Sequence, residues 1–273
     1  MRGVRALATL GVVVAALAAT GTAQASVVDD AASSTNWAGY AVSGSTFTDV
    51  KGTWTQPALT CAVHGSTYAA FWVGIGGFGG GPGGLEQIGT EGECEQTKPS
   101  YSVWYELLPD AAIAIPMAIA PGDTVSAEVS VDGSAATLTI TDPTSGGTFT
   151  TTATPEELDT SSAEWIAEAP SQCFGSRCLQ LTLANFDTVQ FSGSSTTANG
   201  HVGTISDASW NATAIDLGGN VSAAPAPLSP DGAAFTVVVS QAQTLPVVQT
   251  KPKAKAKAKP KRPHRTRAAT PAA

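Results

Sequence analysis

Four short segments of the chain carry most of the side chains that could do chemistry. They combine tryptophan with amide and carboxylate groups: NWAGY at residues 36–40, FWVGI at 71–75, LEQIG at 85–89 together with YSVWYE at 101–106, and AEWIAE at 163–168. A carboxylate that shares a cleft with aromatic rings can act as a general acid or base, because its surroundings shift its pKa. The same carboxylate at a solvated rim has no such role, and the pattern alone leaves both placements open.

Other common catalytic signatures are absent from the sequence. It contains no G-x-S-x-G nucleophile elbow, no H-E-x-x-H zinc motif and no Asp-Thr-Gly or Asp-Ser-Gly loop. His64 and His201 have no evident serine or cysteine partner, and we interpret them as ordinary loop residues. Acid–base chemistry would therefore depend on carboxylates, and we expect neither a metal ion nor an organic cofactor.

The elements that must position these side chains are predicted to be strands. Apolar and polar residues alternate in short runs broken by Gly, Pro, Asn and Asp, as in 124–131 and 136–141 on either side of an Asp-Gly turn. Only TPEEL at 154–158 resembles the start of a helix. The pattern predicts about 12 to 14 strands in one all-β domain, an antiparallel β-sandwich of the jelly-roll or concanavalin-like kind.

In this order, the four segments resemble the motifs of the glutamic peptidases, also called eqolisins or peptidase family G1. The resemblance extends from about residue 35 to 239 and includes Trp-Val-Gly-Ile, Gln-x-Gly, Trp-Tyr-Glu and Ala-Glu-Trp-Ile-x-Glu. It implies a sandwich of two large antiparallel sheets and a catalytic pair, Gln87 and Glu168. Glu168 would act on water as general base and then as general acid, while Gln87 would stabilise the oxyanion.

The implied function is an acid-acting endopeptidase with polypeptide substrates. We expect Trp37, Trp72, Trp104 and Glu106 to contribute to substrate binding. Hydrogen bonds to the charged form of Glu168 would lower its pKa, and the predicted pH optimum is about 3 to 5. Family members tend to have Asp where this chain has Gly76 and Ser102, which bears on substrate preference and acid adaptation.

Two other functions remain open on the residues alone. A glycoside hydrolase would use two carboxylates, such as Glu106 and Glu168. A non-catalytic carbohydrate-binding sandwich would use Trp37, Trp72 and Trp104 as stacking surfaces. The peptidase hypothesis requires Gln87, and neither alternative does.

Charge is distributed very unevenly along the chain. The net charge of −8 combines 14 basic with 22 acidic residues, but nine of the basic residues lie after residue 250. All acidic residues and only three basic ones (Lys51, Lys98 and Arg177) lie between residues 29 and 231. This acidic body has no basic face for a nucleic acid. We expect a monomer whose basic tail either is simply solvated or contacts an anionic cell envelope or the acidic body itself.

The ends of the chain have compositions of their own. A basic start, an apolar run and Ala23-Gln24-Ala25 predict a secretory signal peptide at 1–25, and no later stretch is apolar enough for a membrane-spanning helix. We expect a linker at 26–34, the sandwich at 35–249 and a disordered Lys/Pro/Ala-rich tail at 250–273. The predicted location is extracellular, and association with the cell envelope depends on which of these roles the tail has.

Export makes disulfides the expected state of the four cysteines. Of the three pairings, the local one is favoured: Cys61 with Cys94 and Cys173 with Cys178. Glutamic peptidases also have a small disulfide loop soon after the catalytic glutamate. A zinc site is disfavoured because no C-x2-C spacing or suitably spaced histidine is present.

Overall fold

A computed structural model describes residues 29–79, 83–174, 177–219 and 221–241. The predicted signal peptide at 1–25 and the predicted disordered tail at 250–273 lie outside these residues, so both stay predictions.

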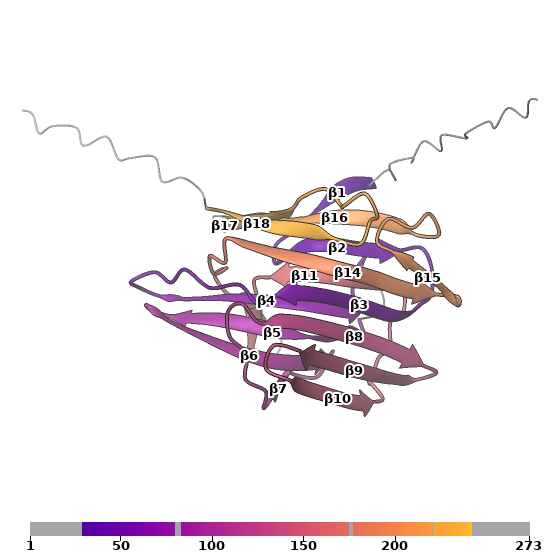
Figure 1. The fold of residues 1–273 in the computed structure, drawn as a ribbon, viewed down its shortest axis with the longest axis horizontal. Coiled ribbons are helices and arrows are strands. Elements are labelled where there is room, and N and C mark those ends of the chain that lie inside the picture. The colour runs from indigo at the N-terminus through magenta and orange to yellow at the C-terminus, as the bar shows by residue number, and fades with distance from the viewer. Residues whose placement is uncertain (1–28, 80–82, 175–176, 220, 242–273) are drawn as a thin grey trace, which may run out of the picture. The chain divides into compact units, whose positions relative to one another are not determined.

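The described part of the chain consists of strands and connecting loops (Figure 1). The strands are β1 (Asp29–Ser34), β2 (Trp37–Ser43), β3 (Phe47–Thr55), β4 (Ser66–Ile75), β5 (Glu86–Glu95), β6 (Lys98–Leu107), β7 (Ile113–Ile115), β8 (Thr124–Asp132), β9 (Ala135–Asp142), β10 (Gly147–Ala153), β11 (Ser162–Glu168), β12 (Ser171–Phe174), β13 (Arg177–Gln180), β14 (Thr188–Ala198), β15 (His201–Thr204), β16 (Asn211–Leu217), β17 (Val221–Pro225) and β18 (Phe235–Gln241). The all-β prediction is confirmed. None of these residues forms a helix that could cross a membrane.

One continuous hydrogen-bonded sheet forms both layers of the sandwich. Its order is β10-β9-β8-β3-β14-β18-β17-β16-β2-β11-β4-β5-β6-β7. β17 pairs with β18 along its whole length, but with β16 through only one residue pair, Leu217 with Ala223. The sheet folds from one layer into the other at this weak junction. As a result β3 packs against β4 and β11, and β8 against β4 and β5. The predicted antiparallel sandwich is therefore one sheet folded onto itself.

Alternation along the strands divides the apolar residues between two clusters. The larger cluster fills the space between the layers and includes the fully buried Phe71, Val73, Ile88 and Trp165. The smaller one lies on the opposite face of β11, β4, β5 and β6, and contains Ala41, Ala70, Trp72, Leu85, Trp104, Ile166 and Ile215. This second face is built on the motif segments of the sequence.

Two local predictions differ from the structure. Residues 29–34 were expected within a linker, but they form β1. This strand pairs in parallel with β16, on the edge of β16 where β17 makes only one residue pair. Residues 154–158, expected to be helical, form an irregular connection between β10 and β11. The segment is too short for a stable helix, and Asp159 just after it accepts hydrogen bonds from the backbone N–H groups of Gly77 and Ser161.

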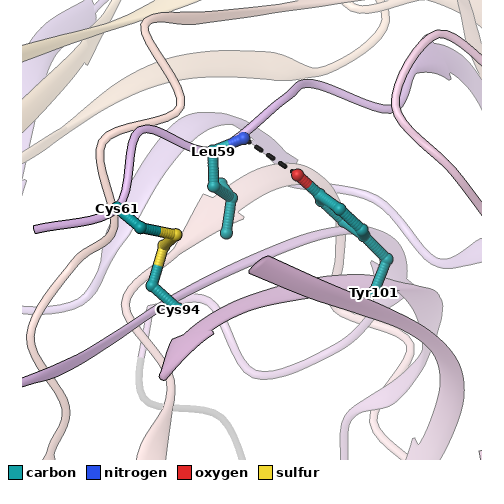
Figure 2. The surroundings of a disulfide bond; sticks show 4 residues. All are labelled: Leu59, Cys61, Cys94 and Tyr101. Carbon is teal, nitrogen blue, oxygen red and sulfur yellow. Dashed lines mark hydrogen bonds between the residues drawn. A yellow bond between two sulfur atoms is a disulfide. The ribbon is translucent and has the colours of Figure 1, made fainter. Parts of the chain in front are cut away.

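A disulfide between Cys61 and Cys94 confirms one predicted pair (Figure 2). It links the loop after β3 to the end of β5, and the Leu59 N–H donates a hydrogen bond of 3.0 Å to the Tyr101 hydroxyl beside it. Cys178 is disulfide-bonded, and the backbone register of the β12–β13 hairpin sets Cys173 opposite it. The side chain of Cys173 lies outside the described residues, so the second pairing stays a prediction.

Candidate active site

Cross-strand register brings the motif segments onto one face of the sheet. Residues directly opposite each other in neighbouring strands point to the same side. From β11 through β4 and β5 to β6, three successive rows are Glu164–Gly74–Gln87–Glu106, Ile166–Trp72–Gly89–Trp104 and Glu168–Ala70–Glu91–Ser102. We call the side on which these rows lie the site face. Gln87 and Glu168 thus share a face, with Trp72 in the row between them.

Glu168 is the last residue of β11, and donors from both neighbouring strands hold its carboxylate. The Trp72 indole on β4 donates to Oε2 at 2.8 Å, and the Asn36 amide at the start of β2 donates to Oε1 at 2.9 Å. The orientation of the carboxylate is therefore fixed at both oxygens. Glu168 as a whole residue is half-buried.

Burial raises the pKa of Glu168 from 4.5 to about 7. Hydrogen bonds from Trp72, Asn36 and Trp37 oppose this increase, and the charge of Glu106 adds to it. Donors to the carboxylate are present as expected, but the predicted net lowering of the pKa of Glu168 is wrong, because desolvation outweighs the donors.

Gln87 and Glu106 form a second polar pair on the site face. The Gln87 Nε2 donates to Glu106 Oε2 at 2.7 Å. Gln87 is only 4% exposed, and its Oε1 is buried without a hydrogen-bond partner among the described residues. Burial raises the pKa of Glu106, against the lowering effect of the Gln87 hydrogen bond. The amide is thus oriented by a carboxylate and keeps a second N–H for another acceptor.

The three tryptophans expected to bind substrate differ in their surroundings. Trp72 is fully buried and packs edge-on against Trp37, with ring centroids 5.0 Å apart. Its ring is covered, so its role in this structure is to hold Glu168 rather than to offer a stacking surface. Trp37 is partly exposed, and Trp104 is 9% exposed with an indole N–H that has no partner in the described part of the chain.

Two positions near the site require glycine because neighbouring atoms leave no room for a Cβ. A Cβ on Gly89 would lie 2.2 Å from the Phe71 carbonyl oxygen and 2.6 Å from the Trp72 Cβ, so a side chain there would displace Trp72. Gly76 has a φ of +92°, and a Cβ would lie 2.6 Å from the carbonyl oxygens of Asp159 and Gly84. The backbone at Gly76 therefore leaves no room for the Asp that glutamic peptidases tend to have at this position.

Residues 35–237 match the sequence profile of the Peptidase A4 family. The chain belongs to this family. It is the family of the glutamic peptidases, as the motifs predicted, and its members hydrolyse peptide bonds. Membership favours the peptidase hypothesis over the glycoside hydrolase and the carbohydrate-binding sandwich.

Individual relatives agree with membership of the A4 family. Aspergillopepsin-2 of Aspergillus niger is 29% identical over 198 residues, which cover 64% of this chain and 68% of the relative. The solved structure of aspergilloglutamic peptidase from Aspergillus niger is 27% identical, covers 64% of this chain and 99% of its own, and has a TM-score of 0.54. Scytalido-glutamic peptidase with a transition state analog inhibitor shares the fold, with a TM-score of 0.65, 23% identity, and coverage of 76% of this chain and 98% of that one.

Sequence analysis of this A4 peptidase gave no role to three polar residues that lie on β5 and β11 or just before β2. Asn36 was part of a recognised motif, but no role was given to it. Glu86 and Glu164 are both fully buried, and none of their carboxylate oxygens has a hydrogen-bond partner among the described residues. The period of two in a strand puts Glu164 on the same face as Glu168, but it does not distinguish a buried carboxylate from a solvated one.

No metal site is evident in the described residues, where no three His, Cys, Asp or Glu side chains are grouped to hold an ion. A surface cavity of about 260 Å³ lies over the other layer, lined by residues of β3, β8, β9 and β14 that include Lys51 and Glu128. It contains none of the motif residues.

Proposed function

We propose that this chain is an acid-acting endopeptidase in which Glu168 transfers the protons and Gln87 stabilises the oxyanion. The observation that carries the proposal is the carboxylate of Glu168, held by Trp72 and Asn36 on the same sheet face as the Gln87 amide. Membership of the A4 family supports the reaction type.

The raised pKa of Glu168 changes the order of proton transfer expected from the sequence. With a pKa of about 7, roughly one carboxylate in a thousand is ionised at pH 4, so a base-first enzyme would be slow in acid. In our proposal the carboxyl starts protonated. As water attacks the scissile carbonyl carbon, one oxygen of Glu168 accepts a proton from the water and the other gives its proton to the amide nitrogen.

This scheme conserves protons and electrons. A water O–H bond and the C–N bond break, C–O and N–H bonds form, and Glu168 ends as protonated as it began. The free N–H of Gln87 donates to the carbonyl oxygen as negative charge develops there. The amide does not titrate, so this donor is present at every pH. Activity should be high at about pH 3 to 5 and decline as the pH rises through about 7.

The test is cleavage of acid-denatured serum albumin at pH 4 by wild type, Gln87→Ala and Glu168→Gln. We expect Glu168→Gln to be inactive and Gln87→Ala to lose on the order of 10² to 10³ in rate, with folding retained by circular dichroism. Full activity in either folded variant would refute the assignment. A rate that instead rises toward a plateau above pH 7 would support a base-first mechanism and reject the acid scheme.

We also propose that the protein is secreted as a monomer and that its basic tail contacts an anionic envelope. The predicted signal peptide supports export, and the Cys61–Cys94 disulfide fits an oxidising compartment. N-terminal sequencing of the protein from culture medium should begin at Ser26. Deletion of residues 250–273 should release envelope-bound enzyme into the medium, and an unchanged distribution would reject the role of the tail.

A further inference from the structure

The turn between β1 and β2 forms a small hydrogen-bonded unit next to Glu168. The Ser34 hydroxyl oxygen accepts hydrogen bonds from the backbone N–H groups of Asn36 and Trp37, at 3.2 and 3.0 Å. The same hydroxyl donates to the Asn36 Oδ1 at 3.2 Å. Because Ser34 occupies the oxygen of the Asn36 amide, the Nδ2 donor of that amide faces Glu168.

The backbone fixes this unit relative to Glu168. The carbonyl oxygen of Asn36 accepts the N–H of Ala169 at 2.8 Å, which extends the β2–β11 ladder by one pair beyond Glu168. Ser34 is the last residue of β1, whose pairing with β16 holds the other side of the turn. The Asn36 amide is therefore placed by two strand pairings and a side-chain hydrogen bond.

We propose that Asn36 is a positioning residue, oriented by Ser34, that fixes the Glu168 carboxyl for both proton transfers. The inference rests on the proposed function of Glu168. Trp72 holds one oxygen from β4 and Asn36 holds the other from the β2 side, so rotation of the carboxyl would break one of the two bonds. Without Asn36, the Glu168 carboxyl can rotate about its Cγ–Cδ bond. The oxygen that accepts a proton and the oxygen that donates one are then no longer held in fixed positions.

The same contact affects proton affinity. An amide donor favours the charged carboxylate, so its removal raises the pKa of Glu168 further. The titratable group that acts on Glu168 across the site face is Glu106 on β6, and Glu91 on β5 lies in the same cross-strand row. The directly adjacent residues on β2 and β4, Trp37 and Ala70, do not titrate.

The experiment compares wild type, Asn36→Ala, Ser34→Ala and the exposed control Asn211→Ala, with acid-denatured serum albumin as substrate. We expect Asn36→Ala to lower kcat about tenfold with KM within about twofold, and Ser34→Ala to lower it about threefold. Asn211→Ala should match wild type. The decline of activity at high pH should move upward by about half a pH unit in Asn36→Ala, and ¹³C NMR of the Glu168 carboxyl should show the same shift.

Wild-type kcat and an unmoved Glu168 titration in folded Asn36→Ala would overturn the proposal. If that variant does not fold, Ser34→Ala decides by the same two measurements. Failure of the proposed function can be distinguished from failure of this proposal. If the proposed function were wrong, Glu168→Gln would retain activity, whatever the activity of Asn36→Ala.

Discussion

Two positions of β11 carry glutamates with opposite surroundings. Glu164 and Glu168 share one face of the strand, four positions apart. Glu168 is partly exposed and has a donor on each oxygen, whereas Glu164 is fully buried and neither of its oxygens has a partner in the described structure. The comparison shows that the neighbouring segments, and not the strand pattern, decide which carboxylate has hydrogen-bond donors.

Glu86 resembles Glu164 rather than Glu168. It precedes Gln87 on β5 and faces the interior of the sandwich, with both oxygens buried and unpartnered among the described residues. Burial raises its pKa from 4.5 to about 8, and the charge of Asp159 adds to the increase. Burial likewise raises the pKa of Glu164 well above its usual range; the nearby Ser162 side chain opposes this increase, and the charges of Asp159 and Glu86 add to it. Both groups are therefore neutral in acid, where their burial costs less than burial of the charged form.

The largest expected difference is in activity between variants of the two β11 glutamates. Glu168→Gln should lower kcat/KM by about a thousandfold or more at pH 4, because a Gln side chain cannot exchange protons with water and the leaving amine. Glu164→Gln should change it by less than about tenfold, since Glu164 is neutral at this pH and donates to nothing in the site. Steady-state kinetics on one peptide would compare them, and equal losses would remove the distinction.

The next effect concerns stability at alkaline pH. A group whose pKa is higher in the folded than in the unfolded state stabilises the fold, and the full contribution is present at pH values below the unfolded pKa. For Glu86 the unfolded pKa is near 4.5, and the contribution is lost as the pH rises through about 8. At about 1.4 kcal/mol per pKa unit, the loss amounts to several kcal/mol. Glu86→Gln should therefore raise the melting temperature relative to wild type at pH 8 but not at pH 4.

Glu156, which is exposed, provides the matched control for this stability measurement. Glu156→Gln should follow the wild-type dependence on pH. If Glu86→Gln lost stability between pH 4 and 8 as steeply as wild type, Glu86 would not be the group that limits the fold.

The smallest expected effect connects Glu106 to Glu168. Glu106→Gln removes the charge that raises the pKa of Glu168, while its amide oxygen can still accept the Gln87 hydrogen bond. The decline of kcat/KM near pH 7 should therefore move down by a fraction of a pH unit. Glu95→Gln, an exposed change farther along β5, should leave the profile unmoved. An upward shift in Glu106→Gln would contradict the charge interaction.

The sequence by itself determined the fold class, the family and the residues of the site face. Alternation in AEWIAE and SVWYE puts Glu164 on one face with Glu168, and Trp104 on one face with Glu106, because a strand has a period of two. Linear spacing also favoured the Cys61–Cys94 disulfide. These features are local, or follow from motifs that are specific to the family.

Only the tertiary structure decided which partner each carboxylate has. The pairing of β11 with β2 and β4 brings Asn36 and Trp72, 132 and 96 residues away in the chain, to Glu168. The raised pKa of Glu168, the burial of Trp72 and the unpartnered oxygens of Glu86 and Glu164 likewise depend on which strands and loops cover each side chain. Burial and hydrogen bonding are properties of packing between distant segments, and a strand pattern in one segment contains neither.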